Sequence, residues 1–421
     1  MQKYVNLHTY PIYMNVKEIR AQFPILATKV YGKPLVYLDN AASSQRPVAV
    51  VQEWFRLAQN SNANIHRAVH ALAGEATEAY ENTRVFVKEY LNAAHREEIV
   101  FTSGATASIN LVAFSFGEAF VSEGDEIIVS TADHHSNIVP WQMLCERKKA
   151  LLKVLDIRPG GELAVEQLKE LITNRTKIVA IAHISNVLGI VNPVREIVDI
   201  CHKKGVPVLV DGAQGIVHGR VDVQALDCDF YAFSGHKVYA ATGTGVLYGK
   251  KKWLEAMPPY MGGGEMIDTV RFSGTTYAPL PGKFEAGTQN FNATPTLVPA
   301  LSLAKSFAED VETIENQKHI TRYIYNFLSS HPLITLYGKP ERTEDKIPLF
   351  SFAVKGAHHE DLALIMDKMG VALRSGQMCA EPLMDRLGVT GLLRASFAPY
   401  NTMEEAEYFV KALEKAINML I

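Results

Sequence analysis

The chain has 421 residues, of which 48% are hydrophobic and 21% are charged, a composition typical of a globular protein with a large core. Its net charge of −3 argues against a surface built to bind nucleic acid or an anionic membrane. Four cysteines do not make a disulfide framework in a chain of this length, and no apolar run approaches the ~18 residues of a membrane span. We therefore expect a cytoplasmic protein with no nucleic-acid or membrane partner.

The middle of the chain alternates strand-like and helix-like segments. Six runs rich in β-branched residues are expected to form strands: IVFTSG (99–104), EIIVST (126–131), LLKVLDI (151–157), KIVAIAHIS (177–185), VPVLVDGA (206–213) and FYAFSG (230–235). Helical patterns lie between them, for example at 105–120 and 193–205. This alternation predicts an α/β fold with right-handed crossovers and a mostly parallel sheet, and the apolar strands indicate that helices cover both of its faces.

The pattern changes after about residue 300. Residues 296–330 have a long helical pattern, and strand-like pieces follow at 333–338 and 349–356. Before them, residues 260–290 are rich in Gly, Thr and Pro, and a loop of that length in a compact domain is usually functional. The predicted regions are an N-terminal segment that packs with a small domain (1–29), a large α/β domain (30–300) and a small α+β C-terminal domain (301–421).

Polar residues follow the predicted strands at their carboxyl ends, where open α/β sheets bind ligands. After the first strand, Gly104, Ala105 and Thr106 begin a helix. The free N–H groups of that helix suit a phosphate, unless Thr106 or Ser103 is simply its N-cap. After the second strand comes His134, which is either a structural residue or a ring that lies flat on a planar cofactor.

Two further strand ends carry opposite charges. Asp211 closes an apolar strand and is either an N-cap for the next helix or an anion held against a cationic ring nitrogen. Lys237 directly follows a strand, where burial would lower the pKa of its amine and free it for Schiff-base chemistry; a surface lysine is the alternative. A phosphate cradle, a flat ring, a carboxylate and a strand-end lysine are together the groups that pyridoxal phosphate requires.

One of the four cysteines has an unusual context. Cys379 lies in ALRSGQMCAEPL (372–383), which has Gly and Pro on either side of the thiol and is typical of a loop. The other three lie in helical patterns or beside a strand and are expected to pack in the core: Cys145, Cys201 and Cys228.

No metal site is expected from the histidines. His66 and His70 have the i, i+4 spacing of a metal-binding pair. However, Arg67 occupies the position at which the H-E-x-x-H motif requires a glutamate.

Eight motifs give the chain a recognisable family. They are YLDNAASSQRP (37–47), NIHRAVH (64–70), DHHSNIVPWQ (133–142), HISNVLG (183–189), VLVDGAQ (208–214), DFYAFSGHK (229–237), FEAGTQN (284–290) and LLRASFAPYN (392–401). With these motifs the chain resembles the class V, fold-type I pyridoxal phosphate enzymes over essentially its whole length, and more narrowly the group II cysteine desulfurases of the Suf iron–sulfur assembly type. The resemblance implies a mostly parallel seven-stranded sheet covered by helices, plus a smaller α+β C-terminal domain.

The resemblance also implies roles for single residues. Lys237 carries the Schiff base with pyridoxal phosphate, His134 stacks on its ring, and Asp211 pairs with the pyridinium nitrogen. Cys379 is the nucleophile, which takes the sulfur of L-cysteine as a persulfide and leaves L-alanine. Further positions implied for the cofactor are Gln214 at the phenolic oxygen, Asn186, and, at the phosphate end, Ala105, Thr106, Ser234 and His236. Thr288 is implied at the cofactor of the neighbouring subunit. For the substrate, the resemblance implies Arg394 and Asn186 at the carboxylate, with His66 and Arg374 close by.

The partners that the resemblance implies are a second copy of the chain in a homodimer, L-cysteine, and a sulfur-acceptor protein of the Suf type. Selenocysteine lyase activity is compatible with the same chemistry. Because the thiol must reach the cofactor and then hand over its sulfur, its loop should be exposed and mobile, with Ser375–Gly376 supplying flexibility. The short spacing from Arg374 to Cys379 matches group II, although Gln377 and Met378 replace two histidines that are common in the family.

Two other functions are compatible with the sequence. One is a different class V reaction, such as transamination or lyase chemistry, in which Cys379 is dispensable. The other is a non-catalytic scaffold, which the loss of Lys237 or Asp211 would have favoured; both residues are present.

Overall fold

The computed structural model describes residues 15–67 and 69–421, so residues 1–14 of the predicted N-terminal segment lie outside the described residues. A seven-stranded sheet forms its centre, in the strand order β4-β10-β9-β8-β7-β5-β6. Its strands are β4 (Ile99–Thr102), β5 (Glu126–Ser130), β6 (Leu151–Leu155), β7 (Thr176–Ala182), β8 (Val208–Asp211), β9 (Phe230–Ser234) and β10 (Gly245–Gly249). β10 is antiparallel to both of its neighbours and all other adjacent pairs are parallel, which confirms the predicted mostly parallel sheet.

β10 is the strand of this sheet that the sequence pattern did not predict. It begins and ends with glycine, and Gly245 packs directly on Gly104: a Cβ atom at Gly245 would lie 2.4 Å from the Cα atom of Gly104. Glycine is therefore required for the close approach of these two backbones, and it weakens the β-branched signature that marks the other strands. Gly104 directly precedes the helix α4 (Ala105–Phe120), so the same contact also fixes the backbone at the start of that helix.

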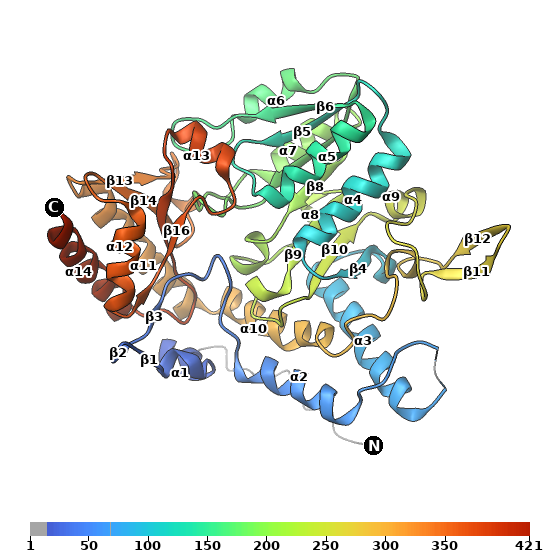
Figure 1. The fold of residues 1–421 in the computed structure, drawn as a ribbon, viewed down its shortest axis with the longest axis horizontal. Coiled ribbons are helices and arrows are strands. Elements are labelled where there is room, and N and C mark those ends of the chain that lie inside the picture. Colours follow the sequence, from blue (N-terminus) through green and yellow to red (C-terminus); the bar gives the residue numbers. More distant parts are fainter. Residues whose placement is uncertain (1–14, 68) are drawn as a thin grey trace.

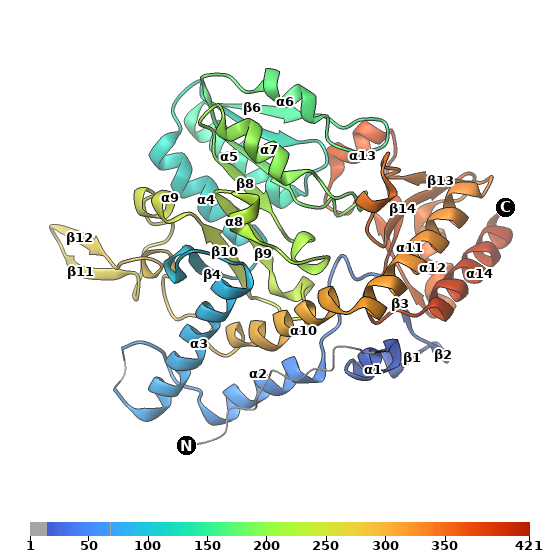
Figure 2. The same ribbon diagram turned by 180° about the vertical axis from the view of Figure 1, so that it is seen from behind.

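Helices cover both faces of the sheet, as the apolar strands indicated (Figures 1 and 2). On one face, α4 (Ala105–Phe120) and α5 (Val139–Lys148) share a hydrophobic core with Ile178 of β7. On the other face, α7 (Val194–His202) shares a core with Val179, the next residue of the same strand. Successive strand residues thus point to opposite layers, and both sides of the sheet are buried.

A second, four-stranded sheet lies in the C-terminal part of the chain, drawn in orange and red in Figure 1. This part consists of β13 (Ile334–Tyr337), β14 (Leu349–Val354), β16 (Arg374–Gly376), β17 (Leu392–Ser396), α11 (Val311–Ser330), α12 (His359–Lys368) and α14 (Met403–Leu420). The strands pair antiparallel in the order β13-β14-β17-β16. With the three helices they enclose a hydrophobic cluster of their own, to which Phe352, Leu393 and Phe409 belong.

The helical pattern over 296–330 forms two helices. α10 (Leu297–Glu309) ends before Asp310, and the Asp310 carboxylate caps α11 by accepting the N–H of Thr313 at 2.9 Å. An aspartate at an N-cap stabilises a new helix start, which apolar periodicity alone does not reveal. α10 also runs across residue 300, where the sequence pattern places the boundary between the two predicted domains. That boundary stays a prediction.

The remaining elements connect or flank the two sheets. They are α1 (Val16–Ala21), α2 (Val48–Asn60), α3 (Ala71–Tyr90), α6 (Val165–Leu171), α8 (Val223–Leu226), α9 (Lys251–Ala256), α13 (Glu381–Leu387), β1 (Lys29–Val30), β2 (Lys33–Pro34), β3 (Val36–Tyr37), β15 (Val371–Ala372), β11 (Ile267–Arg271) and β12 (Gly274–Tyr277). β11 and β12 form a hairpin inside the predicted loop 260–290, and the hairpin projects from the body of the molecule (Figure 1). α1 contacts α14 through an ion pair of 2.7 Å between Arg20 and Glu405. Across residues 15–67 and 69–421, no helix has the length and apolar character needed to span a membrane.

Candidate active site

The carboxyl end of the large sheet brings an amine and a carboxylate together. Lys237 ends a short 3-10 turn that directly follows β9, and Asp211 is the last residue of β8. Asp211 is buried, and burial raises the pKa of its carboxyl while the nearby Lys237 opposes the rise. Burial also lowers the pKa of the Lys237 amine, and Asp211 opposes that change. A lysine with a lowered pKa is available as a nucleophile and a base, as Schiff-base chemistry requires.

A pair formed by the buried Tyr231 and the half-buried His183 supports the turn after Asp211. The Tyr231 hydroxyl lies 3.0 Å from His183 Nδ1, and a Cβ atom at Gly212 would lie 2.0 Å from the Tyr231 ring. Glycine is thus the residue that allows the turn to pass over the ring. The Asp211 carboxylate accepts the N–H of Ala213 at 2.9 Å, so it closes a local turn and is not the N-cap of the next helix.

The N-cap residue of α4 has no side chain that could bind the N–H groups of the first helical turn. The N-cap is Gly104, so the alternative that Ser103 or Thr106 is the N-cap is wrong. The Ala105 N–H donates to Ser234 Oγ at 2.8 Å. The Thr106 hydroxyl lies 2.7 Å from the hydroxyl of Ser136. A helix N-terminus with hydroxyl groups beside it suits a phosphate.

Two further predicted cofactor residues contact the motif at 37–47. His236 Nδ1 lies 3.4 Å from Ser43 Oγ, and Gln214 donates to the carbonyl of Ala41 at 2.8 Å. Burial lowers the pKa of His236 to about 4, so its ring is neutral near pH 7. These contacts bring the N-terminal motif to the strand ends of the large sheet.

His134 and its neighbour Asp133 follow β5. The Ser136 N–H donates to His134 Nδ1 at 3.0 Å, and burial together with the charge of Lys237 lowers the pKa of His134 to about 3, so this ring is also neutral. Asp133 is fully buried, and burial raises its pKa to about 7. Its carboxyl accepts N–H groups at 2.7 Å from both Ser130 and Ala182, which links the ends of β5 and β7. Sequence reasoning missed Asp133, although a carboxylate directly after an apolar strand was its signal.

An arginine from the small sheet reaches the same place. Arg394 on β17 is buried and donates to the Asn186 carbonyl at 2.8 Å and to Asp39 Oδ1 at 3.3 Å. Its buried Nε atom has no hydrogen-bond partner among the residues that the structure describes, and burial lowers its pKa to about 10. Arg374 donates to Asp39 Oδ2 at 2.7 Å, so Asp39, which sequence reasoning also missed, holds both arginines. A buried guanidinium with an unused donor suits an anionic substrate group.

Cys379 lies on the loop between β16 and α13. Its side chain is exposed, whereas the other cysteines are buried, as predicted: Cys145, Cys201 and Cys228. Burial raises the pKa of each of these three thiols. Asn186 Nδ2 donates to the Met378 carbonyl at 2.9 Å. Cys379 is also close enough to Lys237 and Arg394 to affect the pKa of both. The predicted exposure is confirmed, and the mobility of the loop stays a prediction.

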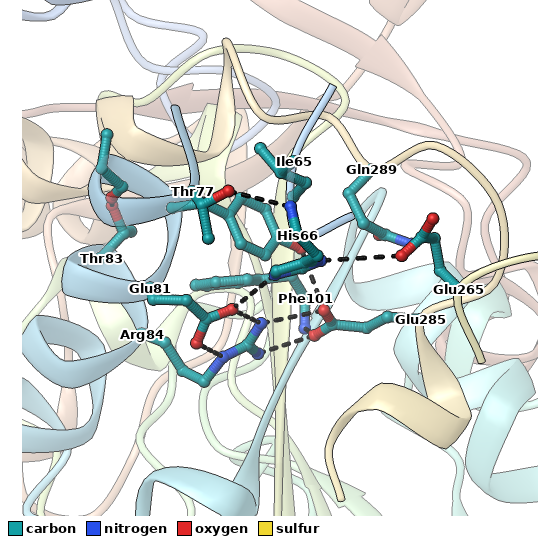
Figure 3. Close-up of polar contacts among 12 residues, drawn as sticks. Ile65, His66, Thr77, Glu81, Thr83, Arg84, Phe101, Glu265, Glu285 and Gln289 are labelled. Atoms are coloured by element: carbon teal, nitrogen blue, oxygen red, sulfur yellow. Dashed lines mark hydrogen bonds and ion pairs between the residues drawn. The ribbon is translucent and has the colours of Figure 1, made fainter. Parts of the chain in front are cut away.

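His66 belongs to a different cluster (Figure 3). His66 Nε2 lies 3.1 Å from Glu81 Oε1, and this contact raises the pKa of His66. Glu81 in turn accepts from Arg84, which also binds Glu285. Thr288 is exposed, in the segment that follows Glu285. Within residues 15–67 and 69–421, no three His, Cys, Asp or Glu side chains are grouped so as to hold a metal ion.

The residues at the strand ends fit pyridoxal phosphate. The uncapped start of α4 offers N–H groups to a phosphate. Asp211 offers a buried carboxylate to a pyridinium, and Lys237 offers a desolvated amine to an aldehyde.

The sequence matches the family Aminotransferase class-V over residues 36–409. A probable cysteine desulfurase from Vibrio cholerae serotype O1 is 43% identical over 408 residues, which cover 97% of this chain and 100% of the relative. A cysteine desulfurase from Enterobacter sp. strain 638 is 46% identical over 406 residues, which cover 96% of this chain and 99% of the relative. Among solved structures, the cysteine desulfurase CsdA of Escherichia coli matches with a TM-score of 0.88 at 40% identity, covering 97% of this chain and 100% of that one.

Proposed function

Because this chain belongs to the aminotransferase class-V family and groups there with the cysteine desulfurases, we propose that it converts L-cysteine to L-alanine and retains the sulfur as a persulfide on Cys379. One observation carries the proposal. An exposed thiol lies within electrostatic reach of the half-buried Lys237 and the buried Arg394. A nucleophile, a base and an anion-binding group therefore meet at the end of the large sheet.

The residues that would hold pyridoxal phosphate are those at the strand ends. Lys237 would form the covalent link, Asp211 would face the ring nitrogen, and His134 would lie on the ring. The remaining cofactor positions would be Gln214 and Asn186 at the ring and Ala105, Thr106, Ser234 and His236 at the phosphate. When bound, the cofactor supplies a sink for the electrons released at the substrate Cα atom.

Different side chains bind the substrate and accept its proton. Arg394 and Asn186 receive the carboxylate of L-cysteine, and the unpartnered Nε of Arg394 gains an acceptor. Arg374, which donates to the same Asp39, would lie close to this carboxylate. Lys237, whose pKa burial lowers, accepts the proton from the substrate Cα atom at Nζ.

Cys379 attacks the substrate sulfur as a thiolate. A bond forms between Cys379 Sγ and that sulfur while the bond between the substrate Cβ and sulfur breaks. The electron pair of the broken bond stays with the carbon fragment. This fragment takes one proton at Cβ and regains the Cα proton from Lys237, and it thus becomes alanine. One thiol and one L-cysteine thus give one persulfide and one alanine, and no separate oxidant is needed.

The proposal extends to the setting of the reaction. The small domain (301–421) would bring the thiol to a cofactor held by the large domain (30–300). Two copies of the chain would form a homodimer in which Thr288 reaches the neighbouring cofactor and His66 lies near the substrate; the exposure of Thr288 within one chain supports this. The persulfide would pass to a Suf-type acceptor for iron–sulfur assembly in the cytoplasm, with selenocysteine as a second substrate, and the exposure of Cys379 supports such a transfer.

The test is the release of sulfide and alanine from L-cysteine in the presence of a reductant. Wild type is compared with Cys379→Ala and with the control Cys145→Ala, which removes a buried thiol. We expect wild type and the control to release both products, and Cys379→Ala to release neither. All three should keep the absorbance band near ~420 nm of the bound cofactor.

Other outcomes point to the alternatives. If Cys379→Ala matches wild type, Cys379 is not the nucleophile and the chain carries out a different class V reaction. If wild type shows neither products nor the absorbance band, the chain is a non-catalytic scaffold.

A further inference from the structure

The loop that carries Cys379 has an unfavourable backbone conformation. Met378 and Cys379 have φ angles of 52° and 55°, in the left-handed region that favours glycine. For L-amino acids this conformation is unfavourable, so two such residues in succession persist only where neighbouring contacts hold them. Specific anchors must therefore fix this loop.

The anchors lie on the side of the large sheet. The loop leaves β16 of the small sheet at Gly376. Met378, Ala380 and Leu383, however, belong to the same hydrophobic cluster as Val179 of the large sheet. In both ribbon views α13, which follows the loop, lies between the two sheets (Figures 1 and 2). The thiol is thus carried on a segment whose apolar residues belong to the same core as one face of the large sheet.

His135 contacts this segment at two points. Its backbone N–H donates to the Cys379 carbonyl at 2.8 Å, and its Nε2 accepts the backbone N–H of Glu381 at 3.0 Å. Glu381 is the first residue of α13, and the N-cap residue Ala380 provides no capping side chain. The His135 ring therefore satisfies one of the N–H groups that a helix start leaves unpaired. Since Nε2 accepts this hydrogen bond, it carries no proton.

The same short turn carries the other groups of the site. His134, the ring proposed to lie on the cofactor, is the N-cap of the 3-10 turn His135–Asn137. Ser136 in that turn contacts Thr106 at the start of α4. One turn therefore carries the His134 ring and contacts both the start of α4 and the loop that carries Cys379.

We propose that His135 is a positioning residue for the sulfur-transfer step. Its hydrogen bond from Glu381 sets the loop conformation in which Cys379 meets the substrate sulfur. The inference rests on the proposed function, because this alignment matters only where Cys379 is the nucleophile. The His135 side chain acts through the backbone of the loop and not on the substrate.

Two variants separate the acceptor from the rest of the side chain. His135→Leu removes the acceptor, whereas His135→Gln retains one, because the Gln side-chain oxygen reaches about as far as Nε2. Both keep the backbone N–H that binds the Cys379 carbonyl. The variants are compared with wild type, all loaded with pyridoxal phosphate. One measurement is hydrogen exchange of the Glu381 amide, and the other is the single-turnover rate at which Cys379 gains sulfur from L-cysteine.

Loss of one hydrogen bond predicts a roughly five- to tenfold faster exchange in His135→Leu and a similar loss of the sulfur-transfer rate, with the cofactor absorbance unchanged. His135→Gln should remain within about twofold of wild type in both measurements. Faster exchange in His135→Leu with an unchanged transfer rate would overturn the inference, because His135 would then only stabilise α13. Equal defects in both variants would also overturn it. If wild type gains no sulfur on Cys379, the proposed function fails, and hydrogen exchange alone decides whether His135 holds the loop.

Discussion

Two buried arginines have opposite pKa shifts: Arg84, in the cluster with His66, and Arg394, which reaches the strand ends of the large sheet. Arg84 is 1% exposed and Arg394 is 3% exposed. Burial by itself would lower the pKa of Arg84, but Glu285 and Glu81 outweigh it and the pKa is raised. Glu285 accepts from both terminal nitrogens of Arg84, at 2.7 and 2.9 Å (Figure 3). Around Arg394 burial prevails over the single carboxylate of Asp39, and the pKa falls to about 10.

The difference lies in the number of acceptors that the fold provides. Arg84 is matched by carboxylates within the chain, as is typical of a structural ion network. Arg394 shares one carboxylate with Arg374 and has a buried Nε atom that no described residue binds. A buried cation with too few acceptors is destabilising in the free protein and is stabilised when an anion binds. This contrast distinguishes a group that holds the fold together from one that we propose to bind the substrate.

The largest effect is expected from removing the structural arginine. Arg84→Met leaves Glu285 buried without its cationic partner and should reduce the free energy of unfolding by roughly 3–5 kcal/mol, measured by urea denaturation. Adding Glu285→Gln to this variant should recover part of the loss, because no unpaired buried charge remains. A loss below ~1 kcal/mol for Arg84→Met would remove the contrast between the two clusters.

Arg394→Met should affect binding more than folding. Loss of charge-assisted hydrogen bonds to the substrate carboxylate should raise the KM for L-cysteine roughly 100-fold. The free energy of unfolding should fall less than in Arg84→Met, because Asp39 keeps Arg374. Steady-state kinetics and denaturation on the same samples check both statements. A loss of stability as large as that of Arg84→Met would show that Arg394 is also a structural residue.

A third buried cation extends the comparison to pH. Lys346 donates to the Leu188 carbonyl, and burial lowers its pKa to about 7. Its unfolded pKa is about 10.4, so between about pH 7 and 10 the unfolded chain binds a proton that the folded chain lacks. Over that window the free energy of unfolding should therefore rise with pH by roughly 1 kcal/mol per unit. Lys346→Met should flatten this rise, whereas the exposed control Lys318→Met should keep it.

The smallest effect is expected at the exposed partner of Asp39. Arg374 is 47% exposed, and exposed ion pairs contribute little to stability. Arg374→Gln should change the free energy of unfolding by about 0.5 kcal/mol or less, and should raise KM less than Arg394→Met does. If the two variants have equal effects on KM, burial is not what distinguishes the two arginines.

Local signals predicted most of the large sheet. β4 to β9 agree with the predicted strands because runs of β-branched residues bounded by turns can be read within a short window. Lys237 and Asp211 stood out because each lies at a strand end, and the fold brings them close enough to affect each other's pKa. β10 was missed because its first residue, Gly245, serves a backbone contact that only the fold creates.

Long-range pairs were not predictable in this way. Asp39 and Arg394 are 355 positions apart, His135 and Glu381 are 246 apart, and Arg84 and Glu285 are 201 apart. Each of these residues fits a surface position equally well when only its neighbours in sequence are considered. Pairing at such distances follows from the order of the strands, which hydrophobic periodicity does not specify.

The loop that carries Cys379 has its ends in two different parts of the fold. Residues 377–380 separate the last residue of β16 from the first residue of α13, so five Cα–Cα steps join the two ends and span at most roughly 18 Å. While both ends stay packed, this tether bounds the travel of the thiol, whatever flexibility Ser375–Gly376 provides. The sulfur acceptor proposed above would then have to approach to within that distance. A small rotation of one sheet against the other would carry the thiol with it, so the relative placement of the two sheets sets the reach of the sulfur.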